Sequence, residues 1–370
     1  MKFIADAHIP FLKGLLEQYG EAVYLDGKAF TNESIADADA LFIRTVTKIN
    51  EELLRNTRVK AVFSATIGFD HIDTDYCKRN GIAWFNAPGC NSGSVRQYIT
   101  SALIEIGRLK GFAPEGKTLG IIGLGNVGKK VAEAAKRLGM RVLKYDPPRE
   151  LNEGSREFCK LTTIAEEADI ITFHTPLVKE GDYPTFHLGD RRFFDSLKRK
   201  PVIINSARGP IIETRALKEA IKEGKVSGSI IDCWENEPSI DRELLSMVDI
   251  ATPHIAGYSA DGKGNATRMS LESLSAFFNL NPLSADQVRI PRPTPDIIDL
   301  NSFSQQNRIE ETLLSTYPIL SESNLLKHQP EKFTFFRENY PLRRENQAYT
   351  VVNYTPEEKE QLQQWGFKLR

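Results

Sequence analysis

Short apolar runs alternate with helical patterns from residue 1 to about residue 90. The runs typical of strands are KFIAD, EAVYLD, ADALFIR and VKAVFSA. Strands that alternate with helices along a chain form parallel sheets whose two faces are covered by those helices. This part of the chain is therefore predicted to form an α/β lobe.

A long helix is predicted next, because Val95, Ile99, Leu103 and Ile106 fall on one helical stripe. After a break at GFAPEGK, a second series of alternating strands and helices begins. Its strand-like runs are TLGIIGLG, RVLKYD, ADIITFHTP, PVIINSARG, GSIIDCWE and DIATPHIAG. The pattern predicts an α/β protein with two Rossmann-like parallel-sheet lobes. Ligands of such sheets bind outside the carboxyl ends of the strands, where the polar residues of these runs gather.

The composition changes at the Pro-rich segment IPRPTPDIID, and residues 286–370 are polar with aromatic clusters. We predict that they form a small C-terminal α+β dimerisation domain, since so short a segment commonly needs a partner surface and two-fold dimers are the default. The alternative is a tail that packs only on its own subunit or stays mobile. The aromatic residues concerned are Phe333, Phe335, Phe336, Tyr340, Tyr349 and Tyr354.

The charge balance narrows the range of partners. The chain has 48 basic and 49 acidic residues, which gives a formal charge of −1. That balance favours neither nucleic acid nor a membrane surface as partner. The four cysteines lie far apart, without a CxxC pair or zinc spacing, and the polar start MKFIADAHIPFLKG is not typical of a signal peptide. We therefore expect a cytoplasmic protein without a disulfide framework or a bound metal.

The motif GLGNVG stands between the strand TLGII and a helix with an apolar stripe. In that context the glycines allow a tight turn, close approach of a pyrophosphate and close packing of helix on strand, and the helix N-terminus attracts the phosphates. Asp146 ends the next strand, where it can accept the adenosine ribose hydroxyls and repel a 2′-phosphate. NAD is therefore the predicted cofactor. Its predicted ligands here are Gly123, Gly125, Asn126, Val127, Gly128 and Asp146.

Three more strand ends carry Arg208, Glu237 and His254. Oxidising an alcohol needs a base for the hydroxyl proton, and histidine suits neutral pH. A carboxylate beside the imidazole orients it, and an arginine can clamp a substrate carboxylate with two parallel hydrogen bonds. Each residue taken singly could instead be structural. Asp232 is predicted to orient the nicotinamide carboxamide, or else to cap a turn.

The chain resembles the D-isomer-specific 2-hydroxyacid dehydrogenases over roughly residues 40 to 280. The motifs that carry the resemblance are IGFDHID, NAPGCN, GLGNVG, TFHTPL, NSARGPIIE, DCWENEP and PHIAGYS. The resemblance implies an NAD-binding Rossmann domain at 94–257. It also implies a substrate-binding lobe at 1–93, completed by about 258–285. Arg208 would bind the substrate carboxylate, His254 would be the acid/base and Glu237 its partner. Where many members have SVAEH, this chain has Ser94-Val-Arg-Gln-Tyr98, so family contacts at that helix are not carried over.

Within that family, the segment HIAGYS and the tail FTFFRENYPLRRE resemble a branch that acts on a small phosphorylated 2-hydroxy acid. The resemblance implies that Thr45, Thr66 and Tyr258 contact substrate and that Thr175 and Gly257 line the NAD site. Phosphoglycerate or glyoxylate remain alternative substrates, and a non-enzymatic NAD-sensing protein is a further alternative. Arg44 is assigned equally to a phosphate or to an ion pair. The other histidines, His8, His71, His174, His187 and His328, are read as structural.

Overall fold

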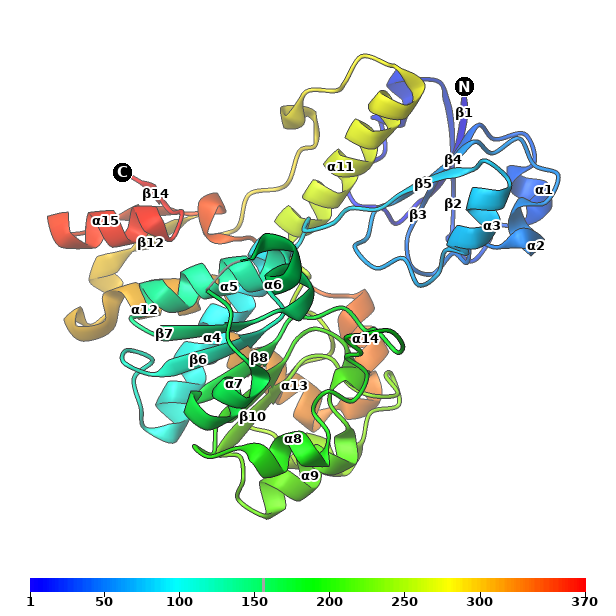
Figure 1. Cartoon of the computed structure of the whole chain (residues 1–370). Helices are drawn as coiled ribbons and strands as arrows, with labels where there is room; N and C mark the ends of the chain where they lie inside the picture. Colours follow the sequence, from blue (N-terminus) through cyan, green and yellow to red (C-terminus); the bar gives the residue numbers. More distant parts are fainter. Residues whose placement is uncertain (155–156) are drawn as a thin grey trace. The chain divides into compact units, whose positions relative to one another are not determined.

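The computed structural model describes residues 1–154 and 157–370, which divide into two compact units (Figure 1). One unit consists of Met1–Asn91 and Ser259–Arg292, and the other of Ser92–Tyr258 and Pro293–Arg370. We call them the N-terminal unit and the nucleotide unit. The last segment, Pro293–Arg370, groups by its contacts with the nucleotide unit.

The N-terminal unit is built on a parallel sheet in the order β2-β1-β3-β4-β5. Its strands are β1 (Lys2–Asp6), β2 (Glu21–Leu25), β3 (Ala40–Ile43), β4 (Ala61–Ser64) and β5 (Ala83–Phe85). The helices that cover it are α1 (Asn32–Ile35), α2 (Glu51–Leu54), α3 (Thr74–Arg79) and α11 (Ala260–Phe278), with short 3₁₀ turns η1 (Leu16–Gln18) and η3 (Ala285–Gln287).

The helix α11 returns late in the chain to complete this unit. Its Leu271 and Leu274 are buried against Phe42 and Phe63 of the sheet. Burial of such apolar side chains contributes about 1.5–3 kcal/mol each. The N-terminal lobe is therefore assembled from two segments that lie far apart in the sequence.

The nucleotide unit contains a second parallel sheet, in the order β11-β10-β9-β8-β6-β7. Its strands are β6 (Thr118–Ile122), β7 (Arg141–Tyr145), β8 (Ile170–Phe173), β9 (Val202–Asn205), β10 (Gly228–Ile231) and β11 (Ile250–Ala251). The order reverses between β6 and β8, and ligands of open α/β sheets bind outside the carboxyl ends of the strands at such a switch point. A ligand site is therefore expected at the loops that follow the six strands of this sheet.

Helices connect and cover these strands (Figure 1). They are α4 (Ser92–Lys110), α5 (Asn126–Arg137), α6 (Pro147–Glu153), α7 (Leu161–Glu167), α8 (Arg191–Ser196), α9 (Thr214–Lys222) and α10 (Arg242–Met247), with the turn η2 (Gly209–Ile211). The inner strands are mostly apolar because both faces of the sheet are buried there, as in β9, whose residues VIIN are all buried.

The C-terminal segment carries its own small parallel sheet, in the order β12-β13-β14. Its strands are β12 (Ile297–Asp299), β13 (Thr350–Val352) and β14 (Lys368–Leu369). Its helices are α12 (Arg308–Thr316), α13 (Ile319–His328), α14 (Phe333–Glu338) and α15 (Pro356–Gln364), with the turns η4 (Leu300–Ser302), η5 (Gln305–Asn307), η6 (Pro330–Lys332) and η7 (Asn346–Ala348).

This segment packs on the nucleotide sheet and does not stand alone. Tyr317 and Ile319 are buried in the core of α4 and the neighbouring strands, and Leu326 and Phe333 are buried in the core on the other face. The predicted small C-terminal α+β segment has its own sheet, and its bounds at 286–370 and its role in dimerisation stay predictions. The aromatic side chains that suggested a need for a partner find much of their apolar cover within their own chain.

The unusual start of α4 explains part of this packing. Gln97 donates to the hydroxyl of Thr316 at 3.1 Å and to the carbonyl of Arg344 at 3.0 Å, and Arg343 donates to the hydroxyl of Ser94. Gln97, one of the residues that depart from the family pattern at this helix, therefore binds the C-terminal segment.

In the described ranges, none of the helices combines the length and apolar character that a membrane crossing requires.

Candidate functional site

The loop after β6 has the form that a dinucleotide requires. A Cβ on Gly123 would lie 2.8 Å from the backbone of His174, and Gly123 has a φ of +94°, which side chains rarely adopt. A Cβ on Gly128 would lie 2.0 Å from the carbonyl oxygen of Gly123. Gly125 has nothing within 4 Å of its Cβ position, so its backbone is open to a ligand. Asn126 and Val127 begin α5 immediately after it.

Asp146 at the end of β7 ties this loop to the next helix. Its carboxylate accepts from the amide of Leu124 at 2.7 Å and caps α6 by accepting from the amide of Arg149 at 3.2 Å. The Arg149 guanidinium donates to the carbonyl of Leu124 at 2.5 Å and pairs with Glu153. A ribose hydroxyl would have to share the Asp146 oxygens with these amides, which a carboxylate with four acceptor sites allows.

Two hydroxyls at the neighbouring strand ends are buried without a hydrogen-bond partner in the described part of the chain. They belong to Thr175 after β8 and Ser206 after β9. Buried polar groups normally find a partner, and these two hydroxyls lie at the strand ends where ligands of such sheets bind. Thr175 was predicted and Ser206 was missed, although it lies inside the NSARG motif. Together with the open glycine loop, these groups fit an NAD molecule along the carboxyl edge.

His254 and Glu237 form a close pair beyond β10 and β11. Nδ1 of His254 lies 2.5 Å from Oε1 of Glu237, and the second carboxylate oxygen accepts from the amide of Trp234 at 3.3 Å. Burial alone would raise the pKa of Glu237, but the hydrogen bond and charge of His254 and the charge of Arg337 outweigh it and lower that pKa. Glu237 is thus ionised at neutral pH, and Nε2 of His254 is left for another partner.

The backbone of His254 is held in an unusual conformation by Asp232. His254 has a φ of +57°, in the left-handed region, and its amide donates to the carbonyl of Asp232 at 2.9 Å. The Asp232 carboxylate accepts from Thr252, from the amide of Ile255 and from the amide of Ala256, at 2.7, 2.8 and 3.0 Å. Burial raises the pKa of Asp232. Its contacts shape the His254 loop, and its assignment to the nicotinamide carboxamide stays a prediction.

Arg208 follows β9 in a turn whose next position, Gly209, has no room for a side chain. A Cβ on Gly209 would lie 1.9 Å from the carbonyl oxygen of Trp234, so Gly209 lets the Arg208 loop and the Glu237 loop pack together. Arg208 donates to the carbonyl of Ala207 at 2.8 Å through one terminal amino group. The rest of its guanidinium makes no hydrogen bond within residues 1–154 and 157–370, which leaves donors for an anion.

Tyr258 closes the same loop after Gly257, and the C-terminal segment reaches it. Nε of Arg337 donates to the Tyr258 hydroxyl at 2.9 Å, and the ring of Tyr340 packs edge-on against that of Tyr258 at 5.9 Å. The contact is between residues 79 positions apart, and no local pattern reveals it.

The chain is similar to known proteins of one dehydrogenase family. Residues 96–256 match the family described as D-isomer specific 2-hydroxyacid dehydrogenase, NAD binding domain. The chain is 54% identical over 353 residues to erythronate-4-phosphate dehydrogenase of Bacteroides thetaiotaomicron. The aligned residues make up 95% of this chain and 99% of that protein. The chain belongs to the D-isomer-specific 2-hydroxyacid dehydrogenase family. It is an NAD-dependent dehydrogenase, and the sequence-based assignment to this family is confirmed.

Solved structures of this dehydrogenase family have the same fold. One is D-lactate dehydrogenase from Aquifex aeolicus, complexed with NAD and lactic acid, with a TM-score of 0.61 and 27% sequence identity to this chain. The match covers 75% of this chain and 96% of the lactate dehydrogenase chain. The NAD⁺-bound 3-phosphoglycerate dehydrogenase of Entamoeba histolytica has a TM-score of 0.64 and 28% identity, with coverage of 75% and 95%. The predicted α/β fold with Rossmann-like lobes and the NAD cofactor are therefore confirmed.

The predicted substrate contacts of the N-terminal unit lie on its own loops. Thr66 follows β4, and its hydroxyl bonds to that of Ser64 at 2.7 Å and to the carbonyl of Gly68 at 3.1 Å. Thr45 is exposed after β3. Arg44 pairs with both oxygens of Asp6, at 2.9 and 3.3 Å, so of the two roles left open for it the ion pair is the one observed.

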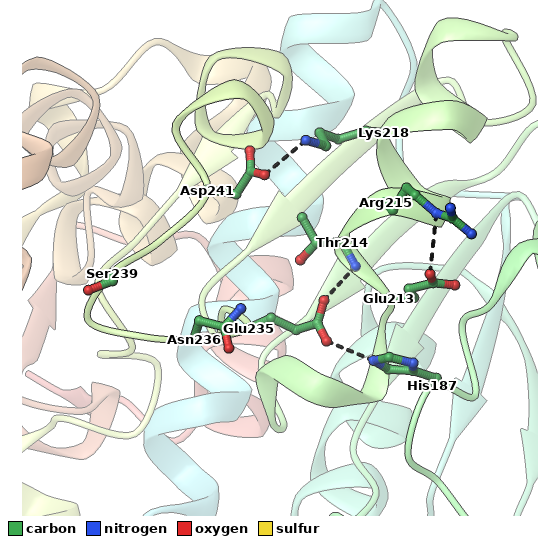
Figure 2. A pocket seen from close by; sticks show the side chains of 9 residues that line it. All are labelled: His187, Glu213, Thr214, Arg215, Lys218, Glu235, Asn236, Ser239 and Asp241. Atoms are coloured by element: carbon green, nitrogen blue, oxygen red, sulfur yellow. Dashed lines mark hydrogen bonds and ion pairs between the residues drawn. The ribbon is translucent and has the colours of Figure 1, made fainter.

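A cavity of about 480 Å³ opens beside the Glu237 loop, and we call it the outer cavity (Figure 2). Its charged groups are paired among themselves. Glu235 binds His187 at 2.7 Å and the amide of Thr214 at 2.7 Å, and Lys218 binds Asp241 at 2.8 Å. It is lined by His187, Glu213, Thr214, Arg215, Lys218, Glu235, Asn236, Ser239 and Asp241. These pairs brace the loop that carries Glu237.

Proposed function

We propose that this enzyme oxidises 4-phospho-D-erythronate to 2-oxo-3-hydroxy-4-phosphobutanoate, a step of pyridoxal phosphate biosynthesis. The observation that carries the proposal is the 54% identity, over nearly the whole of both chains, to a protein named erythronate-4-phosphate dehydrogenase. The ionised Glu237 beside His254, with Arg208 on the neighbouring strand end, supplies the groups that this oxidation needs.

His254 takes the proton of the substrate hydroxyl on C2 through Nε2, while Glu237 holds its Nδ1. The carboxylate stabilises the imidazolium that forms, because an opposite charge beside a cation favours the charged state. Arg208 binds the substrate carboxylate and keeps C2 at a defined position. Bound NAD supplies the acceptor for the hydride of C2. The hydroxyl proton on His254 is then released to solvent, and the substrate leaves as the 2-oxo acid.

The test is a substrate panel with the purified enzyme and NAD, in which the absorbance of NADH is followed. It compares 4-phospho-D-erythronate with D-erythronate, 3-phosphoglycerate and glycolate. We expect the highest kcat/KM for 4-phospho-D-erythronate and a kcat on it about 10²–10⁴-fold lower in His254→Asn. Preference for 3-phosphoglycerate would overturn the substrate assignment. Absence of turnover across the panel would favour an NAD-sensing role instead.

We further propose that the enzyme is a cytoplasmic homodimer assembled through its C-terminal segment. The support is a group of exposed apolar side chains in that segment, Leu325, Phe335 and Leu342. A two-fold dimer is the default symmetry for such a surface. The cytoplasm suits four cysteines that form no disulfide in the structure.

Truncation after residue 285 would remove buried side chains of the nucleotide unit, so point substitutions are the better test of the dimer. We expect Phe335→Glu combined with Leu342→Glu to give a monomer by light scattering. Leu109→Glu, at an exposed apolar position of α4, is the matched control and should leave the mass unchanged. A double variant that stays dimeric would place the contact elsewhere.

A further inference from the structure

Arg337 is the residue of the C-terminal segment that comes closest to the chemistry. It lies near the end of α14, and its Nε donates to the hydroxyl of Tyr258. Its guanidinium lies 5.7 Å from the centre of the Tyr258 ring. Its charge also lowers the pKa of Glu237, the partner of His254. Arg337 therefore belongs to the surroundings of the proposed catalytic pair.

The two terminal amino groups of Arg337 make no hydrogen bond in the described residues, since the bond from Nε to Tyr258 is the one it forms there. No carboxylate forms a salt bridge with it there. The neighbouring Arg343 is buried and donates through Nη2 to the carbonyls of Ile255 and Ala256, while its Nε and Nη1 have no hydrogen-bond partner in the described residues. Arg343 is fixed to the loop after β11 through Nη2, whereas both terminal amino groups of Arg337, the pair that forms a fork, are unbound beside that loop.

A planar fork of donors is the arrangement that binds phosphate with two parallel hydrogen bonds. The proposed substrate has an anion at each end, a carboxylate on C1 and a phosphate on C4. Arg208 is assigned to the carboxylate, so the second anion needs a second cation. Glu237 makes no hydrogen bond or salt bridge to Arg337 in the described residues, since its oxygens bind His254 and the amide of Trp234.

We propose that Arg337 binds the phosphate of the substrate, so that the C-terminal segment of each chain completes its own substrate site. This inference rests on the proposed function for the identity of the substrate. It assigns to Tyr258 the role of holding the Arg337 fork through Nε. It also explains why the tail packs on the nucleotide unit of its own chain.

The test separates the phosphate from the rest of the substrate. Arg337→Gln should lower kcat/KM for 4-phospho-D-erythronate about 100-fold, in line with loss of a charged pair. Arg337→Lys keeps the charge but loses the fork, and should lose about 10-fold. In Arg337→Gln the loss of kcat/KM should be about 10-fold smaller for D-erythronate than for 4-phospho-D-erythronate, because D-erythronate has no phosphate for Arg337 to bind. Lys332→Gln, an exposed position just before α14, is the control for the change in net charge.

A loss of equal size on both substrates would overturn the proposal, because Arg337 would then act through Glu237 or Tyr258. If Arg337→Gln does not fold, the same comparison with Arg337→Lys decides. Binding of inorganic phosphate to the NAD-loaded enzyme, measured by calorimetry, gives an independent readout. Weaker binding in Arg337→Gln than in the wild type supports the site, and unchanged binding overturns it. If the wild type does not oxidise 4-phospho-D-erythronate, the proposed function fails, whereas the calorimetry still decides the role of Arg337.

Discussion

The loop after β10 carries two glutamates that each bind a histidine, yet the two pairs lie in different surroundings. Glu235 binds His187 at 2.7 Å in the outer cavity, and Glu237 binds His254 at 2.5 Å at the carboxyl edge. Only Asn236, with a φ of +58°, separates the two acids. Burial alone would raise the pKa of both carboxyl groups. In each case the hydrogen bonds and the charge of the histidine outweigh burial, and the pKa is lowered.

The difference lies in what surrounds each pair. In the outer cavity the neighbouring charges pair with one another, as Lys218 does with Asp241 (Figure 2). At the carboxyl edge, the hydroxyls of Thr175 and Ser206 and the terminal amino groups of Arg337 have no partner in the described residues. A His–Glu pair alone is therefore a poor guide to catalysis. Unpaired polar groups that gather around such a pair are a better guide, because buried polar groups normally have a hydrogen-bond partner.

The largest expected effect separates the two histidines. His254→Asn should lower kcat about 10²–10⁴-fold, because it removes the general base. His187→Asn, the matched change in the outer cavity, should leave kcat within about 3-fold, because its partners are structural. Steady-state rates at saturating NAD and substrate measure both. Equal losses would mean that the two pairs do not differ in function.

Arg208 tests whether free donors at the carboxyl edge bind substrate. Arg208→Lys keeps the charge but loses the planar fork, so we expect a loss of about 2–4 kcal/mol in transition-state binding. Arg215→Lys, at an exposed position of the outer cavity, is the control and should have no effect on kcat/KM. Near-normal kcat/KM in Arg208→Lys would refute the carboxylate clamp.

Asp146 is an intermediate case. It lies at the carboxyl edge, yet its oxygens already accept hydrogen bonds from two amides, as the paired groups of the outer cavity do from their partners. If it also binds the ribose, Asp146→Ala should weaken NAD about 10-fold, the loss of roughly 1.4 kcal/mol. The same change should narrow the preference for NAD over NADP. The ratio of kcat/KM for the two cofactors is the measurement. If the wild type already uses NADP as well as NAD, Asp146 does not select against the 2′-phosphate and the assignment fails.

The smallest effect concerns stability in the outer cavity. The folded pKa of Glu235 lies below its unfolded value, which is about 4.3. Its ionised form therefore stabilises the fold above that pH, and this contribution is lost as the pH falls through the folded pKa. Glu235→Gln should cost about 1 kcal/mol at pH 7 and less at pH 4. Urea unfolding at both pH values measures the difference. A cost that is larger at pH 4 would contradict the assignment.

Much of this molecule follows from local sequence patterns. The alternation of strands and helices, the glycine spacing of GLGNVG and the position of Asp146 at a strand end each depend on residues close together in the chain. Period-2 and period-3.6 patterns report which side of an element is buried, and glycine reports where the backbone turns tightly. These features place the NAD site and the strand ends without any knowledge of tertiary contacts.

The pairing of side chains needed the fold. Pattern alone does not separate Glu235 from Glu237, and the family resemblance favoured Glu237. The reason for the difference lies in the backbone, since the left-handed conformations of Asn236 and His254 direct side chains to different partners. Arg44 likewise had two possible roles until Asp6 was found beside it.

The C-terminal segment shows the same limit most clearly. Its composition indicated an unmet need for apolar contact, and this was interpreted as a separate domain with a partner. The sequence could not show that Tyr317 and Phe333 are buried on the nucleotide unit, or that Arg337 reaches Tyr258. Such contacts join residues far apart in the chain, so they depend on how whole elements pack. Local periodicity determines which face of a helix is apolar, and only the tertiary structure decides what that face covers.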